Sequence, residues 1–192
     1  MKKVLAVLAA MAVAVLALAG CGGTDDKKAA TETKVLKVGA TAVPHAEILE
    51  QIKDDLKAEG IDLQVVEFND YVQPNLALND KELDANYFQH APYLENFIKE
   101  HPEVKLANAA GIHIEPMGIY SHKVKSLNEV KDGATVAIPN DPTNGGRALI
   151  LLSKAGLITL KDNNDIAATV NDITANPKNL KFQELEAAQV PR

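Results

Sequence analysis

The feature that most constrains the fold is a regular alternation of strand-like and helix-like segments in the first half of the chain. The strand-like segments are rich in Val, Ile and Leu, and the helix-like segments space their apolar residues by three or four. Strand and helix in turn are typical of a parallel sheet covered by helices, which predicts an α/β fold. Strands are expected at Val35–Thr41, Ile61–Phe68 and Asp84–Gln89, and helices at Pro44–Ala58, Gln73–Asn79 and Pro92–Glu100.

The first expected helix, Pro44–Ala58, carries Ile48, Ile52 and Leu56 at a spacing of four residues. This spacing puts the three side chains on one face, which is predicted to be the buried one. Gly60 follows as a stop signal.

The aromatic residues of the chain are concentrated around Leu83–Leu94. The chain has no Trp, four Tyr and four Phe, and six of these eight lie between Phe68 and Phe97. The expected strand here ends at Phe88, Gln89 and His90, just before a helix that Pro92 suits as a first-turn residue. Ligands of open α/β sheets bind outside the carboxyl ends of strands, so this is a candidate binding site. The alternative is that these aromatic residues are only core.

The second half of the chain begins with two extended segments, Val104–Ala110 and Ile112–Tyr120, and then resumes the alternation near Lys123. We expect one α/β lobe at residues 35–120 and a second at 121–192, with a ligand cleft between them. In the second lobe, strands are expected at Ala134–Pro139, Ile158–Leu160 and Leu180–Leu185, helices at Ser126–Val130, Arg147–Ala155 and Ile166–Ile173, a loop at Asn140–Gly146, and a helix start at Glu184–Arg192.

The N-terminus has the pattern of a secretory signal. Lys2 and Lys3 precede the apolar run Val4–Gly20, and the only Cys of the chain, Cys21, follows directly. Residues 1–20 are therefore predicted to be a signal peptide. Residues 21–34 hold no large apolar side chain before Val35 and are expected to form a flexible tether. An uncleaved transmembrane helix with an incidental Cys is the alternative.

Composition excludes several functional classes. One Cys permits neither an internal disulfide nor a thiolate zinc cluster. The chain has a net charge of −6, and Lys2 and Lys3 of the leader are among its basic residues. Such an acidic chain is not expected to bind nucleic acid. No nucleophile–base pair with sensible roles is found, so we expect no enzymatic activity and no cofactor.

The second candidate binding element is the glycine-rich segment before Arg147. Pro142–Gly146 precedes the expected helix, and the unpaired N–H groups of a helix start favour an anion. An arginine placed there could hold a carboxylate through two parallel hydrogen bonds. The alternative is an exposed arginine on a surface helix. The spacing of a phosphate-binding P-loop is absent.

Histidines raise the question of a metal site, because the chain has five of them. No two share a turn of helix and no His-rich loop accompanies them, so the spacing predicts no metal site, although a zinc binder stays an alternative. Of the five, His90 is expected to line the cleft, and His45 to lie near the same strand ends. The other three are His101, His113 and His122.

Several motifs together resemble one family, the methionine-binding lipoproteins of ABC importers (NlpA/MetQ). The matching stretches cover nearly everything after the tether and occur in the same order: Pro44–Leu49, Leu83–Leu94, Glu115–Ser121, Pro139–Asn144, Arg147–Leu149 and Glu184–Arg192, together with Leu18-Ala19-Gly20-Cys21, which resembles a lipobox. The resemblance implies a periplasmic-binding-protein-like fold in which two α/β lobes enclose a ligand cleft. It also implies that Cys21 carries a diacylglycerol thioether and acyl chains such as palmitate, anchoring the protein to the extracytoplasmic side of the cell membrane.

The resemblance further implies a ligand and its contacts. The ligand would be methionine, L- and possibly D-, delivered to an ABC permease and its ATPase subunit. Arg147 and Asn144 would bind the carboxylate, and the remaining ligand-binding residues would surround the thioether side chain: Tyr71, Phe88, His90 and Tyr93. Relatives continue beyond the position of Arg192, so the second lobe is expected to be incomplete. This chain alone is therefore expected to be either unstable or a weak binder of methionine. The alternative functions are a surface lipoprotein with an adhesin or interaction role, and a binder of another small ligand on the same fold.

Overall fold

The computed structural model describes residues 33–191. The predicted signal peptide, Cys21 and nearly all of the predicted tether lie outside the described residues. Within them the first sheet has the order β2-β1-β3, with all pairs parallel, from the strands β1 (Lys34–Thr41), β2 (Ile61–Phe68) and β3 (Ala85–Tyr87). The predicted parallel α/β arrangement of the first half is therefore confirmed, although the third strand is shorter than expected.

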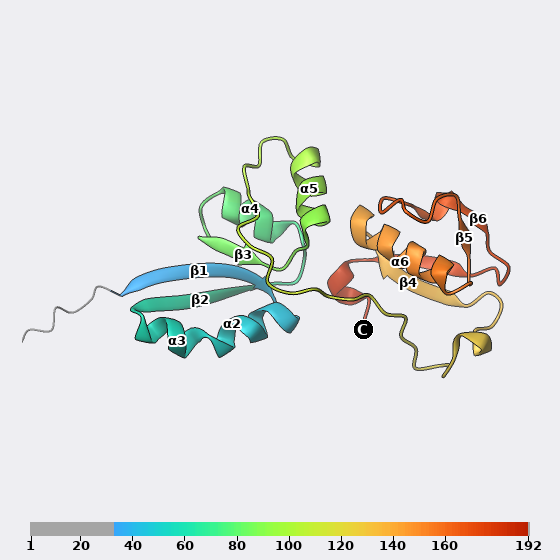
Figure 1. Cartoon of the computed structure of the whole chain (residues 1–192), viewed down its shortest axis with the longest axis horizontal. Coiled ribbons are helices and arrows are strands. Elements are labelled where there is room, and N and C mark those ends of the chain that lie inside the picture. The colour runs from blue at the N-terminus through green and yellow to red at the C-terminus, as the bar shows by residue number, and fades with distance from the viewer. Residues whose placement is uncertain (1–32, 192) are drawn as a thin grey trace, which may run out of the picture. The chain divides into compact units, whose positions relative to one another are not determined.

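Helices connect these strands and follow the last of them. They are η1 (Ala42–Ala46), α2 (Glu47–Gln51), α3 (Lys53–Ala58), α4 (Gln73–Asn79) and α5 (Ala91–Glu100). Helix α3 packs against β2, and α4 packs against β3 and β1 (Figure 1). A small apolar core lies under β1, where Val38, Ala40 and Leu63 are buried.

The prediction for the first helix was wrong in two respects. The helix is interrupted at Ile52, whose φ of −100° and ψ of 0° separate α2 from α3. The buried residues are Ala46 and Leu49, whereas Ile48 and Ile52 are 37% and 40% exposed; of the predicted face only Leu56 packs against the core. The reason is that η1 carries the buried Ala46 directly after β1, and this anchor sets which face of the next turn meets the sheet.

Residues 101–126 form neither helix nor strand, and they run as the long unlabelled connection after α5 (Figure 1). The two extended segments predicted here have no strand partner within residues 33–191. Ile114 and Tyr120 of these segments are open to solvent, at 92% and 89% exposed, whereas Val104 is buried against the first half of the chain.

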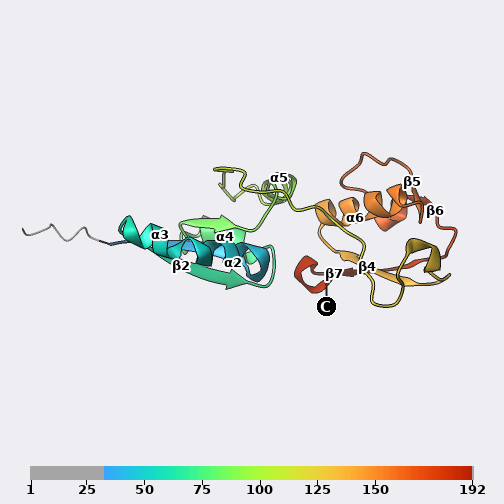
Figure 2. The ribbon, with the colours of Figure 1, turned by 60° about the horizontal axis from the view of Figure 1, so that its bottom comes forward.

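The second half contains two two-stranded sheets. Strand β4 (Thr135–Pro139) is parallel to β7 (Lys181–Leu185), and β5 (Thr159–Leu160) is antiparallel to β6 (Ile173–Ala175). Helix α6 (Pro142–Lys154) packs along β4 (Figure 2). Short 3₁₀ turns complete this half: η2 (Leu127–Glu129), η3 (Val170–Asp172) and η4 (Ala187–Gln189).

The core of this half is formed by α6 and β4. Ile138, Leu149 and Leu152 are nearly inaccessible, and Leu157, Ile158 and Leu180 join them. The spacing of three between Leu149 and Leu152 places both on the face of α6 that meets the sheet.

Two predictions for this half were wrong. The expected helix Ile166–Ile173 is an irregular segment followed by η3 and β6. Asp165 and Asp172 explain this, because their carboxylates accept backbone hydrogen bonds from Ala167 and Thr169 and so favour tight turns over a helix. The expected helix start at Glu184–Arg192 is the end of β7 and the turn η4.

Among the helices of residues 33–191, none combines the length and the apolar character needed to cross a membrane.

Candidate functional site

An aromatic cluster follows the carboxyl end of β3, at the start of α5. The ring centroid of Tyr71 lies 5.6 Å from that of Phe88 and 5.7 Å from that of Tyr93, both in edge-to-face geometry. The hydroxyl of Tyr93 donates to the carbonyl oxygen of Tyr71 at 2.9 Å. Phe88 and Tyr93 are buried and belong to the same apolar cluster as Phe97 and Val104. Three of the predicted ligand-binding residues are therefore in contact, and two of them also serve as core.

A buried amide network holds the loop between β3 and α5 in place. Asn75 of α4 is fully buried, and its side chain bonds to those of Gln89 and Asn86 at 2.7 to 3.0 Å. Asn86 also donates to the carbonyl oxygen of Pro74. Because Gln89 stands between Phe88 and His90, the network fixes the backbone that presents both side chains. Asn75 was not among the predicted site residues, because a single Asn in a helix gives no indication that it is buried.

His90 is the N-cap residue of α5, with extended backbone. Its Nε2 atom is buried and has no hydrogen-bond partner within residues 33–191. Burial lowers the pKa of His90, and the positive charge of Arg147 lowers it further, while Asp141 and Glu115 act in the opposite direction. His90 is thus a half-buried, neutral ring close to Arg147, with one polar atom available for a ligand.

The start of α6 differs from the prediction. The predicted loop Asn140–Gly146 is mostly helical, because α6 begins at Pro142 and Asp141 is its N-cap. The Asp141 carboxylate accepts from the backbone N–H of Asn144 at 2.9 Å, and from the side chains of Thr143 and Asn144. The anion at this helix start is therefore the chain's own carboxylate, and Arg147 lies in the second turn rather than the first.

Glycine allows the first turns of α6 to approach other backbone closely. A Cβ on Gly146 would lie 2.0 Å from the carbonyl oxygen of Ile166, and one on Gly145 would lie 2.9 Å from that of Pro139. The two glycines therefore allow the helix to pack closely against other backbone. This role was not predicted, because the segment was expected to be a loop.

Arg147 is held by two neutral oxygens. Nη1 donates to Oδ1 of Asn144 at 2.8 Å, and Nη2 donates to the carbonyl oxygen of Glu115 at 2.9 Å. No carboxylate of residues 33–191 forms an ion pair with Arg147. The predicted pair Asn144 and Arg147 is thus in contact, and the guanidinium is oriented without being neutralised.

The charge of Arg147 on α6 also influences the pKa values of residues near α5. Burial raises the pKa of Tyr71, Asp141 and Glu115 raise it further, and Arg147 lowers it. Burial is also the main cause of the raised pKa of Tyr93. The charge of Arg147 therefore acts on both His90 and Tyr71.

A cavity of about 230 Å³ lies where the aromatic cluster meets the start of α6. Tyr71 and Tyr93 line it from one side and Asn140 and Asp141 from the other. Phe88, His90, Asn144 and Arg147 are not among its lining residues. A second hollow, of about 510 Å³, lies between the end of α6 and β6 and includes none of the predicted site residues.

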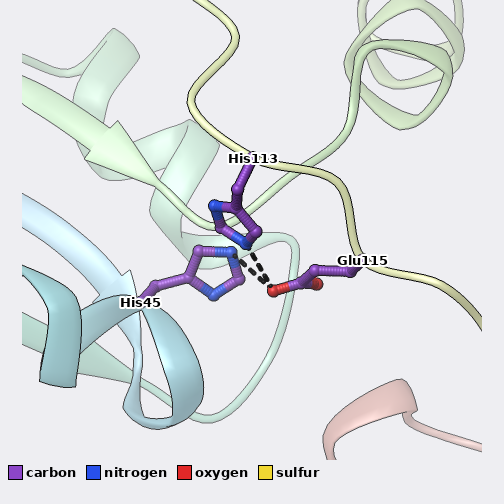
Figure 3. Close-up of side chains that lie close together, drawn as sticks. All are labelled: His45, His113 and Glu115. Atoms are coloured by element: carbon purple, nitrogen blue, oxygen red, sulfur yellow. Dashed lines mark hydrogen bonds and ion pairs between the residues drawn. The ribbon is translucent and has the colours of Figure 1, made fainter.

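A further cluster, which we call the His–Glu cluster, joins His45, His113 and Glu115 (Figure 3). Glu115 Oε1 lies 2.8 Å from Nε2 of His113 and 3.5 Å from Nε2 of His45. Along the chain, no two of the five histidines lie within one helical turn of each other. His45 and His113 come together only in the folded chain, so the spacing of histidines in the sequence could not predict this cluster.

The sequence of this chain is similar to those of known proteins. The sequence profile described as NlpA lipoprotein matches residues 36–192. The D-methionine-binding lipoprotein MetQ of Salmonella typhi is 48% identical over 177 residues, which cover 92% of this chain and 64% of the relative.

Solved structures show the same likeness. A periplasmic substrate-binding protein of an ABC transporter from Coxiella burnetii has a TM-score of 0.73 and 44% identity, covering 80% of this chain and 65% of that protein. A nutrient binding protein from Burkholderia cenocepacia, solved bound to methionine, has a TM-score of 0.76 and 47% identity, covering 82% and 66%. The predicted α/β, periplasmic-binding-protein-like fold is confirmed.

The chain spans a little under two thirds of the length of the first curated relatives. The profile match nevertheless extends over almost all of the residues that follow the predicted tether. This chain belongs to the NlpA lipoprotein family.

Proposed function

We propose that this chain acts as the membrane-anchored substrate-binding lipoprotein of an ABC importer, with methionine as its ligand. The observation that carries the proposal is the state of Arg147, a guanidinium that is oriented by two neutral oxygens and has no carboxylate partner within residues 33–191. A partly buried cation of this kind is suited to an anionic ligand. The names of the relatives, one of which was solved with methionine, supply the ligand class.

The ligand carboxylate would bind to Arg147, with Asn144 holding the guanidinium in orientation. Bidentate pairing satisfies carboxylate geometry and is stronger when water is excluded. His90 would hydrogen-bond the ligand through Nε2, the buried atom that has no partner at present.

The thioether side chain would lie against the aromatic residues Tyr71, Phe88 and Tyr93. Contacts between sulfur and aromatic rings contribute roughly 0.3–1.5 kcal/mol each, and a cluster of rings offers several. The position of Tyr71 and Tyr93 at the 230 Å³ cavity supports this assignment.

Closure would bring both parts of this site onto one ligand. We assign residues 35–120 to one lobe and 121–192 to the other, with the boundary inside residues 101–126, which lack regular structure. A ligand that touches both lobes stabilises the closed state, and the closed state is the form that a permease and its ATPase would recognise. The reaction is binding and release, without bond making or breaking.

Anchoring would be supplied by the N-terminus. We assign residues 1–20 to a cleaved signal peptide, Cys21 to lipid attachment, and residues 21–34 to a tether that holds the lobes off the extracytoplasmic face of the membrane. Each buried methylene of an acyl chain contributes about 0.8 kcal/mol, so two or three chains anchor a protein stably.

The test is a thermal unfolding measurement on the 192-residue chain in mild detergent, with and without L-methionine and D-methionine. A ligand that binds only the folded state stabilises it by about 2.7 kcal/mol at a hundredfold excess over Kd. We expect a raised midpoint for the wild-type chain and no rise for Arg147→Ala.

Lys154→Ala is the matched control, because Lys154 is an exposed cation in the last turn of the same helix. It should respond to methionine as the wild-type chain does. A folded chain whose midpoint does not respond to either enantiomer would overturn the methionine assignment.

A further inference from the structure

We propose that the His–Glu cluster is a binding site for a divalent transition-metal ion, and that zinc is the ion its donors fit best. The cluster offers two imidazole nitrogens and one carboxylate oxygen, which all lie within 4.8 Å of one another. Figure 3 shows both rings directed toward the Glu115 carboxylate. None of its three donors is a proposed methionine contact, although the backbone carbonyl of Glu115 also accepts a hydrogen bond from Arg147.

Each ring is oriented by a hydroxyl group on its far side. Nδ1 of His45 is hydrogen-bonded to Oγ1 of Thr41 at 2.7 Å, and Nδ1 of His113 is hydrogen-bonded to the hydroxyl of Tyr87. Metal-binding histidines typically have their second nitrogen held in this manner, which directs the first nitrogen toward the ion. Both Nε2 atoms are therefore left to face the same carboxylate.

Hydroxyl partners also permit the change of tautomer that metal binding requires. Without metal, each hydroxyl can donate to Nδ1, so that the proton resides on Nε2 and points to Glu115. With metal, Nε2 must present its lone pair, so the proton moves to Nδ1 and the hydroxyl accepts. A hydroxyl can serve either state, whereas a carbonyl or an N–H group can serve only one.

Two of the three distances between donor atoms are already close to those around a coordinated ion, and all three atoms lie within 4.8 Å of one another. Zinc binds histidine nitrogen at about 2.0–2.1 Å and carboxylate oxygen at about 2.0–2.2 Å, so tetrahedral ligands lie roughly 3.3–3.5 Å apart. The two distances from Glu115 to the rings are 2.8 and 3.5 Å. Small side-chain rotations would therefore complete the site without a change of backbone.

Access and environment agree with this assignment. The side chain of His45 is 7% exposed, while those of His113 and Glu115 are 30% and 48% exposed. The floor of the site is thus buried and its outer side is open, leaving a fourth position for water.

The two nitrogen donors indicate which kind of metal ion the cluster would bind. Calcium and magnesium prefer oxygen ligands, whereas imidazole with one carboxylate suits zinc and its neighbours in the first transition row. An ion here would connect His45, just after β1, with residues 113 and 115 of the segment that follows α5. It would thereby hold that segment against the first sheet.

The experiment titrates zinc ions alone into the 192-residue chain in mild detergent, in competition with a chromophoric chelator. All chains carry Cys21→Ser so that its thiol is not a ligand. We expect one zinc ion bound per chain, and at least a tenfold loss of affinity in His113→Ala and in Glu115→Gln. Cobalt added in place of zinc should give the intense visible absorption of a four-coordinate site, and that absorption should disappear in both variants.

His122→Ala is the matched control, since His122 is an exposed histidine of the same segment. It should bind zinc as the parent chain does. Circular dichroism confirms that each variant is folded, which is expected because His113 and Glu115 lie outside every helix and strand. The proposal is overturned if the parent chain takes up no stoichiometric zinc, or if His113→Ala and Glu115→Gln bind zinc as tightly as the control.

Discussion

Arg147 and Glu115 are joined by a hydrogen bond that spans 32 residues of the chain, from Nη2 to the backbone carbonyl oxygen at 2.9 Å. The carboxylate of the same glutamate faces His113 and His45. Glu115 thus uses its backbone to orient the proposed carboxylate-binding residue and its side chain to complete the His–Glu cluster. The two proposed sites meet at one residue of the segment between α5 and η2.

The packing of α6 is the first property that can be tested. Gly146→Ala places a methyl group 2.0 Å from the carbonyl oxygen of Ile166, which is backbone and cannot rotate away. We expect a loss of about 1–3 kcal/mol in the free energy of unfolding, measured by urea denaturation. Gly111→Ala is the control, because nothing lies within 4 Å of its added methyl group, and its effect should stay within about 0.5 kcal/mol. Equal stability of the two variants would contradict the packing account.

The buried amide network is predicted to stabilise the fold. Asn75→Ala removes the partner of Gln89 and Asn86 and leaves their polar atoms unsatisfied. Loss of one partner of a buried hydrogen bond costs about 1–3 kcal/mol, which urea denaturation can measure. Asn163→Ala, at an exposed position with no side-chain hydrogen bond within residues 33–191, should be close to neutral. If Asn75→Ala is also neutral, the network contributes nothing to stability.

The N-cap of α6 should contribute independently. Asp141→Ala removes the acceptor of the Asn144 N–H and of the Thr143 hydroxyl. The expected cost in the free energy of unfolding is about 0.5–2 kcal/mol. Asp132→Ala, an exposed aspartate outside any helix, serves as the comparison in the same denaturation series and should change little. A cap that is dispensable would make these two variants indistinguishable.

The ionisation of His90 should report on Arg147. Burial and Arg147 both lower the pKa of His90 from its ordinary 6.5. In Arg147→Ala the pKa of His90 should rise, because one of the two causes that lower it is removed. Nuclear magnetic resonance titration of the ring protons measures this directly, and Lys154→Ala should leave the value unchanged. A His90 pKa that is the same with and without Arg147 would show that the two groups do not interact.

The same shift has a consequence for stability. Because the folded state holds the pKa of His90 below 6.5, the unfolded chain takes up the proton first as the pH falls. The contribution of His90 is therefore fully present above pH 6.5 and declines as the pH falls through and below that value. Burial lowers the pKa of His45 as well, so it adds in the same direction. Denaturation curves on both sides of pH 6.5 test the sign.

Several elements could be predicted closely because their signals are local. Strand β2 and helix α4 have the bounds that the sequence predicted, Ile61–Phe68 and Gln73–Asn79. Each has its own apolar pattern and its own boundary residues, so the chain on either side contributes little. The helix stop at Gly156 is also local, because its φ of +74° is one that glycine adopts readily.

Predictions were wrong where a distant part of the chain decides. The two glycines before Arg147 indicated a loop, yet they are helical, and the backbone of Pro139 and Ile166 lies so close that a side chain would not fit there. The buried face of α2 and α3 was assigned to Ile48, Ile52 and Leu56. Of these only Leu56 packs against the core, because the anchor after β1 turns Ala46 and Leu49 inward. In both cases the missing information was which backbone lies next to the helix.

For the candidate sites too, the sequence indicated some features, and others arise only from the tertiary structure. Residue type and order along the chain were sufficient to indicate the family, the α/β alternation and the aromatic concentration near β3, and to suggest Arg147 as a candidate binding residue, because each is a property of neighbouring residues. The His–Glu cluster, the unpartnered Nε2 of His90 and the link from Arg147 to Glu115 exist only in the folded chain. They depend on contacts across many residues, and such contacts form only when packing brings separate segments together and excludes the water that would otherwise satisfy each polar atom.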